Sequence, residues 1–284
     1  MLDFRYHITS LVAVFLALAL GILLGSVIVD KGIIAEQQGA LIDSVKSDVK
    51  QVQSENKVLK KDLDETKELQ DKLIPLVVQE RLSGKNVVFI SGATVSDDLK
   101  SYLFESVGKA GAQSLCINIS GGLGLDDPET KNRLSLFFPE ENLSEEDLKS
   151  KIIERLAIEL ATPSDEVFLK ELIDMGIVKM QGNGTLPANC FVFIGADLSD
   201  FNPEAVDLAL IAQLNNFNLP IVGIETEKVK NSCIPLYQEA GVSTIDNVDT
   251  VPGQISLIYT LRGVAGNFGT KSSAEKLLPV VTSQ

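Results

Sequence analysis

Hydrophobic positions first form one long unbroken run near the start of the chain. Residues 8–29 (ITSLVAVFLALALGILLGSVIV) carry no charged side chain. At about 1.5 Å of rise per residue, a helix of this length crosses a bilayer core of roughly 30 Å. A cleavable secretory signal is the alternative, but the run is longer than an ordinary signal core and no Ala-x-Ala sequence follows it. We therefore expect a retained transmembrane helix over 8–29, after a short cytoplasmic end at 1–7.

The next part of the chain is polar, with apolar residues at heptad spacing. Its a and d positions hold Ile42, Val45, Val49, Val52, Asn56, Leu59, Leu63, Thr66, Gln70 and Leu73. β-branched residues at early a positions and one asparagine at an a position favour a parallel two-stranded coiled coil. We therefore predict a coiled-coil stalk over 30–82. Pro75 is expected to break or kink its helix, and Ser83-Gly84 to close it.

The predicted anchor and stalk together indicate a homodimer. In the anchor, small residues recur every four positions and would let two helix backbones approach closely. In the stalk, opposite charges would face each other across the pair, namely Glu55 with Lys60 and Asp62 with Lys67. Two alternatives are a stalk helix packed on its own globular domain and the ordinary abundance of Gly and Ala in membrane helices. The residues expected at the dimer interface are Ala13, Ala17, Gly21, Gly25, Ile42, Val49, Asn56, Leu59 and Leu63.

After Gly84 the pattern changes to short apolar runs that alternate with helix-length stretches. Strand-like runs lie at residues 86–91, 114–119, 190–195 and 220–225. Helix-like stretches lie at 97–110, 144–160, 165–175 and 202–214. Unbroken apolar strands between helices are typical of a parallel sheet covered on both faces. The prediction is an α/β fold, a Rossmann-like three-layer domain over 84–269, followed by a loosely docked tail at 270–284.

Composition narrows the classes of partner and site. The 284 residues carry a net charge of −14, which argues against nucleic acid and anionic membrane surfaces as partners. The three cysteines, Cys116, Cys190 and Cys233, are far apart and match no zinc, haem or redox spacing. Cys116 and Cys190 lie in apolar strand-like runs, so buried inert thiols are the favoured interpretation.

Motifs for nucleotide binding and catalysis are weak in this sequence. The first strand ends in Ser91-Gly92-Ala93-Thr94, which does not match the dinucleotide fingerprint, and there is no P-loop. Residues 121–124 (GGLG) favour a plain turn over an anion cradle, since two aspartates follow shortly after. The only histidine is His7, at the membrane boundary, which excludes Ser-His-Asp and Cys-His catalysis in the body. We predict that the chain is not an enzyme.

Acidic residues follow several of the predicted strands. If the loops after these strands converge at one edge of the sheet, they could bind a hard cation. The favoured interpretation is instead that they lie in solvated loops and cap helices. The residues concerned are Asp197, Asp200, Glu225, Glu227, Asp246 and Asp249.

Two stretches resemble the MctB family of bacterial copper-transport proteins. The anchor sequence at residues 5–22 (RYHITSLVAVFLALALGI), with Gly25-Ser26, resembles the start of that family. Residues 242–249 (VSTIDNVD), running into 252–255 (PGQI), are similar to its acidic segment before the last helix. The order of anchor, coiled coil, first strand at 84–88 (GKNVV) and acidic segment extends the resemblance over most of the chain.

The resemblance implies a role that the residues alone do not. It implies an envelope protein with its body outside the cytoplasm, a point that counting charges beside the anchor leaves open. The implied role is copper transport or homeostasis, with no resident cofactor and copper as the ion handled. Should the body bind copper, Cys116, Cys190 and Cys233 are the candidate ligands, because Cu(I) prefers soft sulfur. The alternative hypothesis is a non-enzymatic dimeric scaffold or regulator of the envelope or cell-division machinery that acts through a membrane partner.

Overall fold

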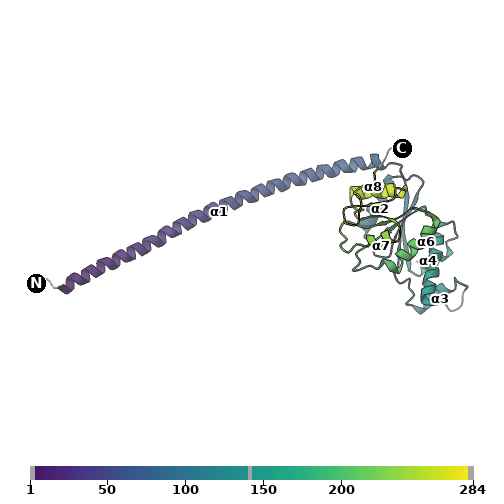
Figure 1. Cartoon of the computed structure of the whole chain (residues 1–284), viewed down its shortest axis with the longest axis horizontal. Helices are drawn as coiled ribbons and strands as arrows, with labels where there is room; N and C mark the ends of the chain where they lie inside the picture. Colours follow the sequence, from purple (N-terminus) through teal and green to yellow (C-terminus); the bar gives the residue numbers. More distant parts are fainter. Residues whose placement is uncertain (1–3, 140–142, 281–284) are drawn as a thin grey trace. The chain divides into compact units, whose positions relative to one another are not determined.

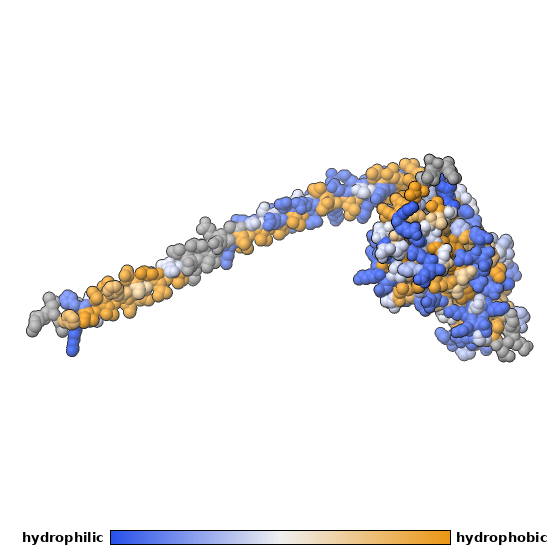
Figure 2. Space-filling view, in the orientation of Figure 1, coloured by the Kyte–Doolittle hydropathy of each residue, from blue (hydrophilic) through white to orange (hydrophobic). Residues whose placement is uncertain are grey.

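The computed structural model describes residues 4–139 and 143–280, and within α1 it leaves the side chains of 29–37, 40 and 71 undescribed. The chain forms two compact units, Met1–Leu69 and Gln70–Gln284. The first unit contains most of helix α1 (Phe4–Val78), labelled in Figure 1. Its segment Phe4–Ile28 is long and apolar enough to cross a membrane, and Figure 2 shows most of this segment as hydrophobic, with hydrophilic residues at its start.

Helix α1 continues through Pro75, so of the expected break or kink the break is wrong, and the kink stays a prediction. The helix ends at Val78, where the Gln79 N–H donates to the Pro75 carbonyl at 2.8 Å. Proline removes one backbone donor from the helix. The side chains of Ile74 and Val78 are buried in the core of the second unit, and this packing stabilises the last turn.

The second unit, here called the body, is built on a seven-stranded sheet. Its strand order is β3-β2-β1-β4-β5-β6-β7, and every pairing is parallel except the antiparallel pair β2 and β3. The strands are β1 (Asn86–Ser91), β2 (Gln113–Ile119), β3 (Val178–Gly182), β4 (Cys190–Ile194), β5 (Ile221–Ile224), β6 (Ser243–Ile245) and β7 (Asn267–Phe268). The four predicted strands correspond to β1, β2, β4 and β5.

Helices cover both faces of this sheet. Along β1, Val88 and Ile90 belong to one apolar cluster and Val87 and Phe89 to another, because successive side chains point to opposite faces. Buried residues of α2 (Asp97–Lys109), α8 (Val251–Leu261) and the end of α1 complete the second cluster. The first cluster is completed by α4 (Glu145–Ala161), α5 (Val167–Asp174), α6 (Asp207–Leu214) and α7 (Ile234–Glu239). In Figure 1, α4 and α6 lie side by side, in agreement with their packing contacts.

Local capping explains where several helices begin. Ser96 accepts the Leu99 N–H at the start of α2, and Ser144 accepts the Asp147 N–H at the start of α4. Asn202 is a cap too, but it starts the short 3-10 helix η1 (Pro203–Ala205). The helix predicted over 202–214 is therefore divided between η1 and α6. A second 3-10 turn, η2 (Asn215–Phe217), follows α6.

Three strands and three helices were not among the runs identified by periodicity. β3 has the mixed sequence VKMQG and pairs on one side only, so it lacks the apolar run of a central strand. β6 and β7 are only 3 and 2 residues long. The additional helices are α3 (Pro128–Ser135), α7 and α8. Of these, the resemblance to the MctB family had implied α8, as the helix after the acidic segment.

Candidate functional site

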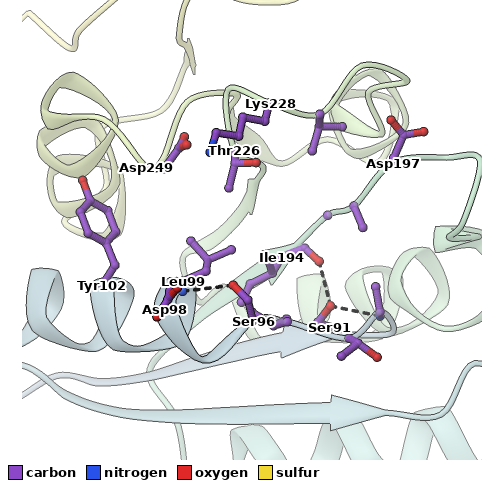
Figure 3. Close-up of a pocket in the computed structure, with 16 residues that line it drawn as sticks. Ser91, Ser96, Asp98, Leu99, Tyr102, Ile194, Asp197, Thr226, Lys228 and Asp249 are labelled. Carbon is purple, nitrogen blue, oxygen red and sulfur yellow. Dashed lines mark hydrogen bonds between the residues drawn. The ribbon is translucent and has the colours of Figure 1, made fainter.

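A cavity of about 520 Å³ lies at the carboxyl edge of the sheet, where β1 and β4 end side by side (Figure 3). In the sheet, β2 lies on one side of β1 and β4 lies on the other side. The cavity therefore lies at the point where the strand order reverses, which is where open α/β sheets bind ligands. Its polar lining includes Thr94, Ser96, Asp98, Thr226, Lys228 and Asp249.

The floor of this cavity is held by a buried serine. The Ser91 hydroxyl, at the end of β1, donates to the Ile194 carbonyl at the end of β4 at 3.0 Å. The same hydroxyl accepts the Ala93 N–H at 3.1 Å. Ser91 thereby joins the ends of the two strands and orders the loop that leads into α2. Both hydrogen bonds of the Ser91 hydroxyl are made to the backbone of the body, so we infer that Ser91 positions the loop and does not contact a ligand.

The first turn of α2 forms one wall. Its N-cap Ser96 already accepts the Leu99 N–H at 3.3 Å, and Asp97 and Asp98 follow it in the first turn. Asp97 is 2.6 Å from the Lys100 ammonium, and this ion pair lowers the pKa of Asp97. Asp98 is exposed and is among the residues that line the cavity. The two carboxylates thus have different environments.

Asp197 ties together the loops after β4 and β5. Its carboxylate accepts the Ser199 N–H at 3.0 Å and the Asn231 side-chain amide at 2.8 Å. The backbone N–H groups of Lys230 and Asn231 also donate to it, each at 3.2 Å. These hydrogen bonds, led by the Asn231 side chain, lower the pKa of Asp197 far below its usual value. Asp197 is therefore an ionised loop-ordering residue.

Glu225, at the end of β5, is fully buried. The favoured interpretation, that the acidic residues lie in solvated loops, is therefore wrong for Glu225. Its carboxylate accepts the Ser232 hydroxyl at 2.7 Å and the Lys271 ammonium at 2.6 Å. Lys271 donates further to the carbonyls of Thr226, at 3.2 Å, and Val229, at 2.7 Å. A lysine of the chain therefore occupies the place beside Glu225 where a cation could have bound, and it orders the loop that lines the cavity.

Asp246, after β6, is buried as well and binds the segment that follows β7. Its carboxylate accepts the backbone N–H groups of Thr270 at 2.8 Å and Lys271 at 3.0 Å. Residue Lys276 also forms a bridge with Phe268 of β7. The part of the expected loose tail that is described is thus bound to the sheet edge, because Asp246 and Glu225 are too deep to leave unpaired.

The other acidic residues of this edge do not converge on one point. Asp249 accepts the Glu227 N–H at 2.8 Å and lines the cavity. Asp200 lines a different, smaller cavity of about 190 Å³. Across residues 4–139 and 143–280, no group of three or more His, Cys, Asp or Glu side chains has a geometry that could hold a metal ion. A hard-cation site built from these carboxylates is not formed.

The three cysteines lie in separate places. Cys116 of β2 and Cys190 of β4 pack in the cluster shared with α2 and α8, while Cys233, just before α7, packs in the cluster on the opposite face. In the register, Cys116 is opposite Phe89 of β1 and Cys190 is opposite Val87. β1 thus separates the two by about 10 Å, since neighbouring strands lie about 4.8 Å apart. Because metal–sulfur bonds are about 2.3 Å long, the structure does not bring them to one ion.

Burial also keeps these thiols protonated. It raises the pKa of Cys190 to about 11 and that of Cys233 to about 12. The pKa of Cys116 is raised by burial too, against a smaller opposing effect of Lys100. The thiolate is the form that binds metals, so each thiol must lose a proton at a cost before it can act as a ligand.

The turn at residues 121–124 is a plain turn, as favoured from the sequence. Leu123 N–H donates to the Ser120 carbonyl at 2.9 Å, and the Leu123 side chain is fully buried in the core. Gly124 has a φ of +66°, a conformation that suits glycine. The motif therefore anchors a loop to the core.

A buried Asp–Tyr pair between α6 and α7 was not identified from the sequence. The Tyr237 hydroxyl of α7 donates to the Asp207 carboxylate of α6 at 2.7 Å, and both side chains are fully buried. Burial raises the pKa of Asp207 to about 7, and the bond from Tyr237 opposes this only in part. The two residues lie 30 positions apart in helices whose contact no local pattern predicts.

Asp207 should make the stability of the body depend on pH. Its folded-state pKa of about 7 is above the ordinary value of 3.8, so the folded state holds an additional proton between these values. The free energy of unfolding should therefore fall as the pH rises from about 4 to about 7. Thermal unfolding of the wild type and of Asp207→Asn across this range measures the effect, since the amide cannot ionise. An equal slope in the two proteins would contradict the assignment.

The residues expected at a dimer interface all lie on α1. Ala13, Ala17, Gly21 and Gly25 fall in the apolar segment, and a Cβ added at either glycine would meet no atom within 4 Å. In the stalk, the predicted seam is exposed in the single chain, with 48–65% of the side chain accessible at Ile42, Val49, Leu59 and Leu63. Asn56 is exposed too. The coiled coil and the dimer stay predictions.

Comparison with known proteins places the chain in one family. The family described as "Copper transport outer membrane protein, MctB" matches residues 1–279. Relatives named copper transporter MctB, from Mycobacterium bovis and Mycobacterium tuberculosis, are 23% identical over 96% of this chain and 98% of their own lengths. The match covers both the apolar helix and the body. The chain belongs to the MctB family.

Proposed function

We propose that this chain is an anchored envelope protein of copper homeostasis, with its body outside the cytoplasm, and that it works by binding and not by catalysis. The observation that carries the proposal is the family match over residues 1–279, supported by relatives named as copper transporters. The anchor would be Phe4–Ile28. The only histidine, His7, falls in that segment, so the body has no histidine to act as a general base.

A single spanning helix gives the protein no pore of its own. Within the described part of the chain, one helix is long and apolar enough to cross a membrane. A pore would need several such helices or a closed barrel. We infer that the chain contributes to copper handling through a membrane or envelope partner.

The stalk favours a second copy of the chain as the first partner. Most of its exposed apolar side chains follow the heptad a and d positions, and Asn56 at an a position would fix the register of two parallel strands. The charges flanking the seam also complement each other in that arrangement, namely Glu55 with Lys60 and Asp62 with Lys67. A lone helix with this surface would leave its apolar side chains in water. We therefore include a parallel homodimer in the proposal.

Copper tolerance of cells tests the proposed function. Removing the protein from its host should change growth across a copper series and not across a zinc series, and the wild-type chain should restore it. A variant with Cys116, Cys190 and Cys233 all replaced by alanine should restore growth as well, because the three thiols are buried in separate places. Its folded amount is checked by immunoblot of the membrane fraction.

Two results would contradict parts of this proposal. Unchanged copper tolerance after loss of the protein would refute the copper role and leave the dimeric scaffold. Failure of the triple alanine variant at normal abundance would show that a cysteine binds copper despite its burial.

A further inference from the structure

The cavity at the β1–β4 boundary has the size and position of a site for a small organic molecule. Its volume of about 520 Å³ is far larger than a bare ion requires and is within the range of small-molecule sites. Apolar side chains of Leu99, Ile194 and Val229 line it together with the hydroxyls of Thr94 and Thr226. Such a lining can take the carbon skeleton and the hydroxyl groups of a ligand at once.

The charges around the cavity exclude a phosphate as the group recognised. Phosphate sites at this place in α/β folds use free N–H groups at a helix N-terminus. Here the Leu99 N–H already donates a hydrogen bond to the Ser96 hydroxyl, and Asp97 and Asp98 add negative charge to the first turn of α2. Asp249 adds a further carboxylate from another loop, as seen in Figure 3. An anion would be repelled from both sides.

The polar groups of the cavity that have free hydrogen-bonding capacity indicate which kind of ligand would bind there. In the described part of the chain, the Asp98 carboxylate makes no hydrogen bond or ion pair, and only one oxygen of Asp249 is bonded, to the Glu227 N–H at 2.8 Å. Lys228 is the one lysine that lines the cavity. The third carboxylate, that of Asp197, is already occupied by loop groups. Two carboxylates with free acceptor capacity and one lysine therefore line the cavity.

We propose that this cavity binds a small organic cation that carries hydroxyl groups, such as an amino sugar. Its ammonium group would donate to Asp98, with the Asp249 carboxylate adding negative charge from another loop, and its hydroxyls would contact Thr94 and Thr226. The ring would pack against the apolar side chains of Leu99, Ile194 and Val229, which also line the cavity. This site is separate from the proposed role in copper homeostasis, and neither depends on the other.

Calorimetric titration of the full-length chain in detergent tests the site, with D-glucosamine as the probe. N-acetylglucosamine has the same ring without the positive charge, and glucose 6-phosphate carries a negative charge instead. We expect saturable binding of glucosamine, binding of N-acetylglucosamine weaker by about tenfold or more, and no binding of the phosphate. Each lost charge-assisted hydrogen bond accounts for about tenfold.

Matched variants separate the cavity from general surface charge. Asp98→Asn should weaken glucosamine binding by about tenfold. Asp97→Asn should not, because Asp97 is paired with Lys100 and does not line the cavity. Lys228→Gln should keep or strengthen binding, since it removes the opposing charge. The proposal is overturned if glucosamine shows no saturable binding, if the acetylated or phosphorylated sugar binds as tightly, or if the two aspartate variants behave alike.

Discussion

Replacing Lys271 with methionine is expected to lower the free energy of unfolding of the body by about 3–5 kcal/mol. The Lys271 ammonium is 2.6 Å from the Glu225 carboxylate, and the Glu225 side chain is fully buried. Methionine has a similar length but cannot pair with that charge. The variant would leave an uncompensated buried carboxylate and would also lose the bonds to the Thr226 and Val229 carbonyls.

Urea unfolding of the full-length chain, followed by tyrosine fluorescence because the chain has no tryptophan, measures this loss. The double variant Glu225→Gln with Lys271→Met should recover part of it, since it removes the buried charge as well. Lys276→Met is the matched control in the same segment, because Lys276 is exposed and its side chain makes no bond within the described residues. If Lys271→Met were no more destabilising than this control, the proposed role of the ion pair would be wrong.

Replacing Leu59 and Leu63 together with aspartate is expected to convert a dimeric chain into a monomer. A parallel dimer would bury four of these leucines, each contributing about 1.5–3 kcal/mol. The dissociation constant should therefore rise by at least about a thousandfold. Sedimentation of the full-length chain in detergent measures the change.

Val58→Asp is the control for this experiment. Val58 is 56% exposed and lies next to Leu59, but at heptad position c, outside the predicted seam. It should leave the dimer intact. A double aspartate variant that stays dimeric would refute the stalk seam. If replacing Gly21 and Gly25 with leucine then dissociated it, the association would belong to the anchor.

The central strands could be predicted because each is apolar along its whole length. β1, β2, β4 and β5 are covered on both faces, so nearly every residue in them is buried. β3 could not be predicted in this way, since its burial pattern includes exposed and polar positions at the sheet edge. The helix starts near residues 97 and 144 could be predicted as well, and the caps that the structure shows there, Ser96 and Ser144, depend on residues only three apart.

The chemistry of the carboxyl edge could be predicted only as a set of candidate residues. Asp197, Glu225, Asp246 and Asp249 do come to the ends of strands, as the alternation of strands and helices indicated. Their partners could not be identified, because Lys271 is 46 residues from Glu225 and the Thr270 N–H that binds Asp246 is 24 residues from it. The bond from Asn231 to Asp197 likewise spans 34 residues.

By itself, the sequence determined the properties that depend on neighbouring residues: an apolar helix long enough to span a membrane, a heptad pattern after it, an acidic body and an α/β fold. The tertiary structure alone decided the strand order, and with it the cavity between β1 and β4. It also decided that the three cysteines lie apart and that Lys271 neutralises Glu225. The physical reason is that local patterns record which side chains are buried, whereas the partner of a buried charge depends on which distant segments the fold brings together.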